Sequence, residues 1–473
     1  MAAQMTGRLP VIALLGRPNV GKSTLFNVLT RSRDALVADQ PGMTRDRKYG
    51  FGETADRRFI VVDTGGIGEE VDEVDSHISR QSRQALEEAD AVLFMVDARA
   101  GLIEVDRQLA LEMRRSGKKV HLVLNKCEHL DIQTAASEFY ALGLGTPYAI
   151  SSSHKHGVAD MIESVLDEIE TEDEALPGDA VEIQGTVVAV VGRPNVGKST
   201  LINRLLGEER VLAMDMPGTT RDSIFIPMER DGRDYTLVDT AGVRRRSRID
   251  DPLEKFSVIK TLQAINEANV VVVMLDARQG IATQDARLLG LVAESGRALV
   301  LAVNKWDGLE EDARQMLRTE LDRKLTFLDY ATVRFISAKH GSGLSELFEA
   351  VDDAYEAAMA ELPTSELTRV LEAAVHAHQP PAIHGRRIKL RYAHQGGHNP
   401  PRIVIHGNQT RHLSDEYRRY LAKRFREAFK LHGTPVQLFF KTGENPYEGR
   451  KNKLSERQQK KRRRLKKHVK KKN

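Results

Sequence analysis

The chain has 473 residues, 41% hydrophobic and 29% charged, so it can bury several cores and is not disordered as a whole. Its single cysteine, Cys127, excludes a disulfide framework and any metal site built from several cysteines. The net charge of +4 is uneven: residues 451–473 carry +12, residues 364–450 carry +8 and residues 1–363 carry about −16, which favours a polyanionic partner for the C-terminal part.

Short apolar runs alternate with amphipathic segments over the first 170 residues. Strands are expected, in chain order, at Val11–Gly16, Phe59–Asp63, Ala91–Asp97, Val120–Asn125 and Pro147–Ser151. Helices are expected between them at Ser23–Thr30, Asp75–Glu88, Val105–Ser116 and Val158–Ile169. This alternation predicts an α/β fold with a doubly wound, mostly parallel sheet, whose ligands bind at the carboxyl ends of the strands.

The same pattern returns later in the chain. Residues 11–46 match residues 187–222 at 21 of 36 positions, with a constant offset of 176. A period this long indicates two whole domains rather than a solenoid, whose units have about 20–50 residues. We therefore predict a first domain at residues 1–169, an acidic linker at 170–184 and a second domain at 185–362.

Each repeat carries a glycine-rich loop between its first strand and the following helix. Both loops read GRPNVGKST and fit the pattern GxxxxGK[ST], in which the backbone N–H groups point at phosphate oxygens. Lys22 and Lys198 should reach the β- and γ-phosphates, and the hydroxyls of Ser23 and Ser199 should bind Mg²⁺. The loop residues predicted to bind phosphate are Gly16, Arg17, Pro18, Asn19, Val20, Gly21, Lys22, Ser23 and Thr24, and Gly192, Arg193, Pro194, Asn195, Val196, Gly197, Lys198, Ser199 and Thr200.

A DxxG motif ends an apolar strand at the same distance after each loop. Its aspartate can hold Mg²⁺ through water, and its glycine N–H can contact the γ-phosphate. The residues predicted here are Asp63, Thr64, Gly65, Gly66 and Ile67, and Asp239, Thr240, Ala241, Gly242 and Val243.

Two further motifs indicate the base. Asp307, in Asn304-Lys-Trp-Asp, can accept both the N1–H and the N2–H₂ of guanine, a donor pair that adenine lacks. The Ser337-Ala338 segment after the next strand would offer a backbone N–H to guanine O6. The predicted base-binding residues are Asn304, Lys305, Trp306, Asp307, Ser337 and Ala338, and in the first repeat Asn125, Lys126, Cys127, Glu128, Ser151 and Ser152.

These motifs resemble the translation-factor-like GTPases, and their tandem arrangement is similar to the bacterial Der (EngA) double-GTPase family. The resemblance covers essentially the whole chain and rests on the paired GRPNVGKST loops, the paired PG-x-TRD segments and RYAHQGGHNPP at residues 391–401. It implies a Mg²⁺-dependent GTPase that binds the large ribosomal subunit, both rRNA and ribosomal proteins, in a nucleotide-dependent way and acts in ribosome biogenesis.

The resemblance also implies residue roles. Thr44 and Thr220 would be switch threonines that close over Mg²⁺ and the γ-phosphate. The catalytic residues would be Lys22, Thr44, Asp63 and Gly66 in the first repeat and Lys198, Thr220, Asp239 and Gly242 in the second. Because Ile67 and Val243 follow the DxxG motifs, neither site has a glutamine there to orient water. The resemblance implies a K⁺ ion bound partly by Asn19 and Asn195, although an asparagine in a turn can also be a backbone cap.

The first repeat departs from the family pattern, with Glu128 where the second has Asp307. Glutamate keeps the carboxylate but adds one methylene group. We predict that the first site keeps its guanine preference at lower affinity.

The C-terminal third has the predicted order α-β-β-α-β of a KH-like domain at residues 363–450. Its elements are expected at Thr368–His378, Arg387–Tyr392, Arg402–His406, Ser414–Lys430 and Val436–Lys441. The segment lacks the GxxG clamp of KH domains, which leaves recognition of RNA shape or of protein open. The basic tail at residues 451–473 is predicted to be disordered, and it could serve solubility, a nuclear signal or rRNA backbone contacts.

Two other functions fit parts of the sequence less well than ribosome assembly does. A tRNA-modifying GTPase would need a modification domain, for which no segment remains. A switch that acts on a protein or an anionic membrane would use the tail as an anchor, but no amphipathic helix or lipidation motif supports it. The apolar runs are shorter than the ~20 residues that span a bilayer, and the N-terminus lacks a signal pattern. We therefore expect a cytoplasmic monomer without membrane contact.

Overall fold

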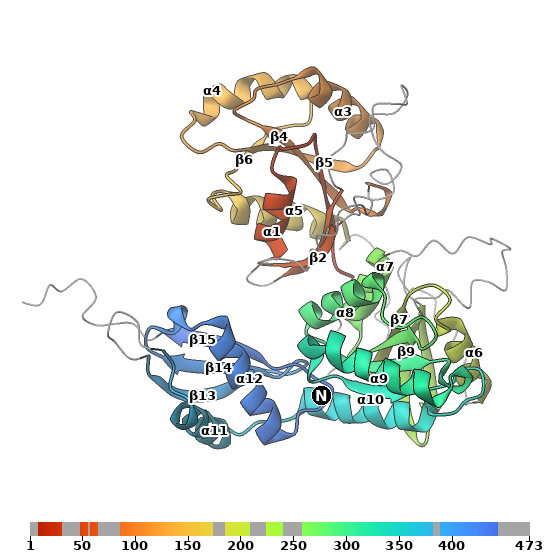
Figure 1. Cartoon of the computed structure of the whole chain (residues 1–473). Coiled ribbons are helices and arrows are strands. Elements are labelled where there is room, and N and C mark those ends of the chain that lie inside the picture. The colour runs from red at the N-terminus through yellow and green to blue at the C-terminus, as the bar shows by residue number, and fades with distance from the viewer. Residues whose placement is uncertain are drawn as a thin grey trace, which may run out of the picture. The chain divides into compact units, whose positions relative to one another are not determined.

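The computed structural model describes residues 8–30, 48–54, 57–64, 86–173, 185–208, 224–239, 258–381 and 388–442. Within these ranges the chain forms two six-stranded sheets and one three-stranded sheet, all flanked by helices (Figure 1). The predicted α/β class with two doubly wound sheets and a smaller α+β unit is confirmed.

The first sheet has the strand order β2-β3-β1-β4-β5-β6. All neighbouring strands are parallel except β2 and β3. Its strands are β1 (Val11–Leu15), β2 (Lys48–Glu53), β3 (Arg58–Asp63), β4 (Ala91–Asp97), β5 (Lys119–Asn125) and β6 (Tyr148–Ala149). Its helices are α1 (Lys22–Thr30), α3 (Glu104–Arg115), α4 (Ile132–Ser137) and α5 (Val158–Asp173), with a 3₁₀ turn at Glu138–Leu142.

The second sheet repeats this topology in the order β12-β11-β10-β7-β9-β8. Its strands are β7 (Thr186–Gly192), β8 (Ile224–Arg230), β9 (Arg233–Asp239), β10 (Val270–Asp276), β11 (Ala298–Asn304) and β12 (Thr332–Phe335). Its helices are α6 (Lys198–Glu208), α7 (Val258–Glu267), α8 (Thr283–Ser295), α9 (Glu311–Lys324) and α10 (Leu344–Met359), with 3₁₀ turns at Trp306–Gly308 and Thr326–Leu328.

Both sheets are buried on their two faces, as expected for parallel strands covered by helices. In the first domain, Ile12 and Leu14 of β1 join a core with Phe26 of α1 and Val165 of α5. Val188 of β7 joins the corresponding core of the second domain. Because this packing fixes the central strands, the loops at their carboxyl ends start from rigid positions.

The third sheet has the order β13-β14-β15. Its elements follow the predicted order α-β-β-α-β as α11 (Thr364–Ala377), β13 (Leu390–Gly397), β14 (Arg402–Gly407), α12 (Asp415–Phe429) and β15 (Gln437–Thr442), with a 3₁₀ turn at Thr410–His412. The hydroxyl of Ser414 accepts a 3.3 Å hydrogen bond from the N–H of Tyr417, which caps the start of α12.

Several elements differ from the sequence-based expectation. Strands β2 and β8 were not predicted; each is an antiparallel edge strand. Helix α5 continues to Asp173, into the segment predicted as a linker. The predicted helix at Asp75–Glu88 lies outside the described residues up to position 85, as does the whole basic tail. Across the described ranges, no helix is both long and apolar enough to span a membrane.

Candidate active site

The glycine-rich loop of each repeat joins the first strand of its sheet to the following helix. Asn19 and Asn195 have φ angles of 65° and 63°, so the loop turns through the left-handed region. Gly21 has a φ of 102°, and a Cβ added there would lie 2.2 Å from Nδ2 of Asn125. A Cβ on Gly197 would lie equally close to Nδ2 of Asn304. Glycine is therefore required where the base-recognition strand approaches the loop.

The loop lysines are held by backbone carbonyl groups. Nζ of Lys22 donates to the carbonyl oxygens of Gly16 and Arg17, both at 2.8 Å. Nζ of Lys198 makes the equivalent bonds to Gly192 and Arg193, both at 2.9 Å. The Lys22 side chain is buried, and burial lowers its pKa from 10.5 to about 8, although the Asp63 carboxylate opposes the shift.

This shifted pKa predicts a pH dependence of nucleotide binding at the first site. Bound phosphates favour the charged lysine, so a protein with neutral Lys22 must take up a proton on binding. Above about pH 8, GDP affinity at this site should fall, by up to about tenfold per pH unit while Lys22 loses its proton.

Calorimetry at pH 8.5 in buffers of different ionisation enthalpy would measure this proton uptake, with the second site silenced by Lys198→Ala. The variant Lys22→Arg should bind GDP without it, since arginine stays charged. Heats that do not depend on the buffer would contradict the prediction.

Hard oxygen donors meet behind the first loop. Oγ of Ser23 donates a 2.9 Å hydrogen bond to Oδ2 of Asp63, whose side chain is buried at the end of β3. A hydroxyl beside a carboxylate fits the oxygen ligation that Mg²⁺ prefers, directly or through water. The hydroxyl of Thr64 instead donates to the carbonyl of Leu14, which ties the DxxG segment to β1.

An asparagine braces each loop against the base-recognition segments. Nδ2 of Asn125 donates to the carbonyl of Val20 at 2.8 Å, and its Oδ1 accepts the N–H of Ser152 at 3.0 Å. In the second domain, Asn304 bonds the carbonyl of Val196 at 2.7 Å and the N–H of Ala338 at 2.9 Å. In each domain one buried amide thus joins the phosphate loop to the segment after the last strand, Ser151-Ser152 or Ser337-Ala338.

The next residue, a lysine, makes a second brace in both domains. Nζ of Lys126 contacts the carbonyl of Asn19 at 2.8 Å and Oδ2 of Asp97 at 2.6 Å. Nζ of Lys305 has the same two kinds of partner, the carbonyl of Asn195 at 2.9 Å and Asp276 at 2.6 Å. Hydrogen bonding from Lys126 holds the pKa of Asp97 below its usual range even though burial opposes this.

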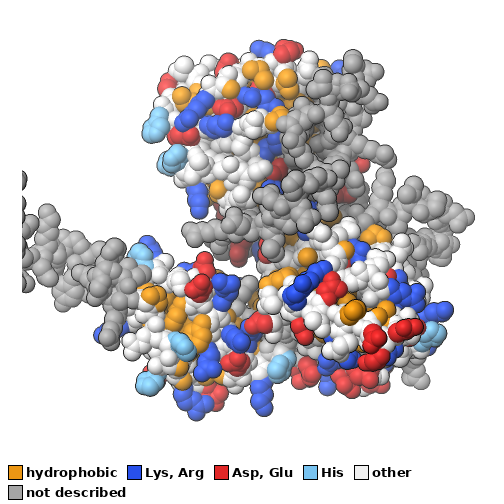
Figure 2. Space-filling view, in the orientation of Figure 1, with side chains coloured by type: hydrophobic (Ala, Val, Ile, Leu, Met, Phe, Trp, Pro, Cys, Tyr) orange, Lys and Arg blue, Asp and Glu red, His pale blue; other side chains and the backbone are white. Residues whose placement is uncertain are grey.

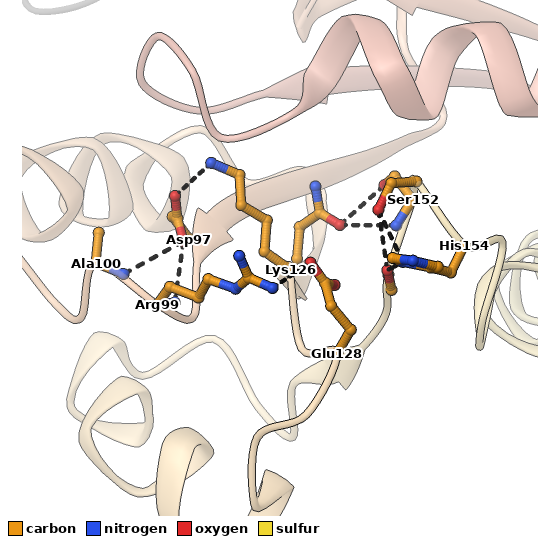
Figure 3. Close-up of polar contacts among 10 residues, drawn as sticks. Asp97, Arg99, Ala100, Lys126, Glu128, Ser152 and His154 are labelled. Carbon is orange, nitrogen blue, oxygen red and sulfur yellow. Dashed lines mark hydrogen bonds and ion pairs between the residues drawn. The ribbon is translucent and has the colours of Figure 1, made fainter.

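The two base-recognition carboxylates have different neighbours. Glu128 lies beside Arg99, with Oε1 and Nη2 2.6 Å apart (Figure 3). Hydrogen bonding to Ser151 is the main cause that lowers the pKa of Glu128, with a further contribution from Arg99. Asp307 lies 3.3 Å from Nε2 of His340. Hydrogen bonding to Ser337 is the main cause that lowers the pKa of Asp307. Both carboxylates are therefore held in the charged form, which can accept two donors.

The arginine side chain of each phosphate loop pairs with a buried carboxylate on a neighbouring helix. Nε of Arg17 lies 3.3 Å from Oδ1 of Asp106, a fully buried carboxylate at the start of α3. Arg193 pairs in the same way with buried Asp285 of α8, at 2.7 Å. These arginines anchor the loop to a helix through their side chains.

The remaining predicted site residues lie outside the described part of the chain. They are Thr44, Gly65, Gly66, Ile67, Thr220, Thr240, Ala241, Gly242 and Val243. Asp239 ends β9, in the position that Asp63 has at the end of β3.

Two phosphate loops of the same geometry, each braced by an asparagine and a lysine, define a GTPase with two tandem nucleotide-binding domains. A family model described as 50S ribosome-binding GTPase matches residues 11–126 and 187–305, and one described as the KH-domain-like C-terminal part of EngA bacterial GTPase enzymes matches residues 361–441. GTPase Der of Thioalkalivibrio sulfidiphilus is 58% identical over 470 residues, covering 98% of this chain and 100% of the relative. The chain belongs to the Der family of GTPases and is a GTP-hydrolysing enzyme.

A second relative agrees with this membership. GTPase Der of Escherichia coli O127:H6 is 54% identical over 487 residues, covering 98% of this chain and 99% of the relative. Among solved structures, an Aquifex aeolicus Era variant bound to GDP and AlF₄⁻ aligns with 56% of this chain and 95% of its own, at 22% identity and a TM-score of 0.28.

Several residues of this site were not predicted from the sequence: Asp97, Arg99, Asp106, Asp276, Asp285 and His340. A signal for some of them exists. The tripeptide Asp-Ala-Arg follows the central strand in both repeats, at 97–99 and 276–278, with the same offset of 179 as the Asn-Lys pairs. A conserved spacing between two repeats of one chain indicates a shared contact, here the ion pair between each aspartate and its lysine.

Glu128→Asp tests the effect of the longer side chain. We expect this variant to bind GDP at the first site several-fold more tightly than the parent chain, because the shorter carboxylate needs no shift of the base. The measurement is fluorescent GDP titration in a Lys198→Ala background. Equal affinities of variant and parent would contradict the prediction.

Proposed function

We propose that this GTPase binds the large ribosomal subunit in a nucleotide-dependent way and acts in its assembly, as a cytoplasmic monomer. The observation that carries the proposal is the match over nearly the whole chain to Der GTPases, together with a family description that names 50S ribosome binding. The two braced phosphate loops supply a separate nucleotide site in each of the first two domains. The predicted domain limits at 1–169, 170–184, 185–362, 363–450 and 451–473 are part of this proposal.

Each site is proposed to hold GTP in the same way. The loop N–H groups and Lys22 or Lys198 bind the β- and γ-phosphates, and the carboxylate of Glu128 or Asp307 binds the base. The Ser151-Ser152 and Ser337-Ala338 segments would lie beside guanine O6, at positions fixed by the hydrogen bonds from the N–H groups of Ser152 and Ala338 to Asn125 and Asn304.

The catalytic roles follow from charge. The lysine of each loop neutralises charge on the transferring phosphoryl group. Ser23 with Asp63, and Ser199 with Asp239, would hold Mg²⁺, with Thr44 and Thr220 as its further ligands. When bound, Mg²⁺ neutralises charge on the phosphate oxygens.

We also propose that K⁺ supports hydrolysis through Asn19 and Asn195. Both residues are exposed at the turn of the loop, and within the described residues neither side-chain amide has a hydrogen-bond partner. GTP turnover should therefore be faster in KCl than in NaCl at matched ionic strength. Asn19→Ala and Asn195→Ala together should remove the difference, and equal rates of the parent chain in the two salts would exclude this role.

The third domain and the tail are proposed to contact rRNA. Helix α12 exposes Arg419, Lys423 and Arg424, and Figure 2 shows lysine and arginine side chains over this part of the surface. With the tail, this part of the chain is strongly basic. Phosphate contacts of this kind depend on salt and read little sequence.

Sedimentation with purified ribosomal particles tests the proposal. We expect the protein to travel with the large subunit in the presence of a non-hydrolysable GTP analogue and much less with GDP, at a fixed moderate salt concentration. The chain without residues 451–473 should bind more weakly and with less dependence on salt. If neither nucleotide supports binding to the large subunit, the proposed partner is wrong, while the GTPase assignment stands.

A further inference from the structure

The carboxylates predicted to recognise the base, Glu128 and Asp307, have different ion-pair partners in the two domains. In the first domain, Glu128 pairs with Arg99 at 2.6 Å (Figure 3). In the second domain, Asp307 contacts His340 at 3.3 Å, and Arg278, which occupies the position of Arg99 in the repeat, makes no ion pair with it among the described residues.

The neighbouring residue Gly308 explains the position of the Arg278 side chain. Its Nη2 atom lies only 2.3 Å from the point where a Cβ on Gly308 would stand, so the arginine packs over this glycine. In the first domain the residue that corresponds to Gly308 is His129, which carries a side chain where glycine has none. Arg99 therefore cannot occupy the equivalent space and lies against the carboxylate instead.

The histidines show the complementary change. His154 corresponds to His340 at the offset of 186 between the two serine motifs. Its Nδ1 atom lies 3.0 Å from the hydroxyls of both Ser151 and Ser153, so it bonds serines rather than the base-recognition carboxylate. The side chain in ion-pair contact with the carboxylate therefore comes from a different loop in each domain.

A partner that orients the carboxylate matters more for the longer side chain of glutamate than for that of aspartate. Glutamate has one more rotatable bond than aspartate, so its carboxylate is less well oriented by the backbone alone. The Arg99 side chain is 52% exposed and that of Glu128 is 15% exposed. Exposed ion pairs add little to folding stability, so the expected effect of this pair is on orientation.

We infer that Arg99 is a positioning residue for base recognition in the first domain, where its guanidinium fixes the Glu128 carboxylate toward the N1–H and N2–H₂ of guanine. The inference rests on the proposed binding of guanine nucleotide at this site. The backbone of Arg99 is itself fixed, since its N–H donates to Oδ1 of Asp97 at 3.0 Å.

The pairing leaves room for the base. An ionised carboxylate has about four acceptor positions, of which the bond to Arg99 uses one on Oε1 and the hydrogen bonding to Ser151 uses another. Oε1 and Oε2 can therefore still accept the two donors of guanine. Arg99 orients the carboxylate without replacing the base.

The test compares Arg99→Ala with its parent in a Lys198→Ala background, so that only the first site is read. Titration with fluorescent GDP should show about fivefold weaker binding. The preference for GDP over inosine diphosphate, which lacks the N2 amino group, should fall by a similar factor, because a misdirected carboxylate loses that contact. Arg99→Lys should restore part of the preference for GDP over inosine diphosphate. For Arg99→Ala, kcat at saturating GTP should equal that of its parent.

The repeat supplies a matched control. Arg278→Ala, in a Lys22→Ala background, should change GDP binding at the second site by less than twofold, read by the fluorescence of the single tryptophan, Trp306. In a Glu128→Asp chain, Arg99→Ala should have little further effect, because the shorter side chain does not reach the guanidinium.

Unchanged or tighter GDP binding by Arg99→Ala would overturn the inference; tighter binding would mean that the arginine competes with the base. An unchanged ratio between GDP and inosine diphosphate would also overturn it, since a general loss of fold weakens both ligands alike. If the Lys198→Ala parent binds no GDP, the proposed function of the first site fails, and the inference fails with it.

Discussion

Asp307→Asn should convert the second site from guanine to xanthine recognition. The carboxylate of Asp307 accepts two donors from guanine, whereas the amide of asparagine places its own N–H₂ against the N2–H₂ of the base. A bidentate contact of this kind contributes about 1–3 kcal/mol of discrimination between bases, so GDP affinity should fall by about 100-fold. Xanthosine diphosphate has a carbonyl at C2, which accepts from the new amide, and should now bind.

Trp306 makes this measurement specific to the second site. It is the only tryptophan in the chain and lies next to Asp307, with its ring 4.1 Å from that of Phe335. Titration with GDP and xanthosine diphosphate, followed by its emission, gives both affinities. Asp312→Asn, at an exposed position in the first turn of α9, is the control and should keep GDP preference. A variant Asp307→Asn that still prefers GDP would show that another group selects the base.

Asn304→Ala should have the second large effect, on affinity and stability together. The buried amide of Asn304 makes hydrogen bonds to the carbonyl of Val196 and the N–H of Ala338. The alanine variant leaves both backbone groups without a partner, at about 1–3 kcal/mol for each buried group. Two such losses predict GDP binding at the second site weaker by about 100-fold and a lower midpoint of urea unfolding for the second domain, followed by Trp306 emission.

The first domain provides the matched variant. Asn125 makes the same pair of bonds, so Asn125→Ala should weaken the first site and leave the Trp306 signal and the second site as in the parent chain. If Asn304→Ala keeps both the unfolding midpoint and the GDP affinity of the parent, the amide is not the brace described here.

Most of the site could be predicted from the sequence because its parts are local. A phosphate loop needs a strand, two glycines, a lysine and a helix start within a few residues, and both repeats contain them. The strand β5 and the helix α1 were likewise predicted within one residue of their observed ends at Asn125 and Lys22. The KH-like order of elements followed from apolar periodicity in the same way.

The features of the fold and site that the sequence does not predict depend on contacts between residues far apart in the chain. Arg17 pairs with Asp106 and Asn125 with Val20, and nothing in the local sequence specifies either partner. The edge strand β2 reads Lys-Tyr-Gly-Phe-Gly-Glu, in which two glycines weaken the strand pattern; its pairing with β3 supplies what the local sequence lacks. The pairing of Glu128 with Arg99 depends on the neighbouring residue His129. Only the three-dimensional structure shows that the segment of Glu128 and His129 lies beside Arg99.

The carbonyl groups that hold Lys22 have a consequence for the exchange of GDP for GTP. The ammonium group of Lys22 is bonded to the carbonyl groups of Gly16 and Arg17, and the loop is tied to Asn125 and Lys126. Because all of these partners belong to the protein itself, we expect the loop to keep its shape when the product leaves. We expect the cycle to turn without a separate exchange factor, with its direction set by the cellular ratio of GTP to GDP.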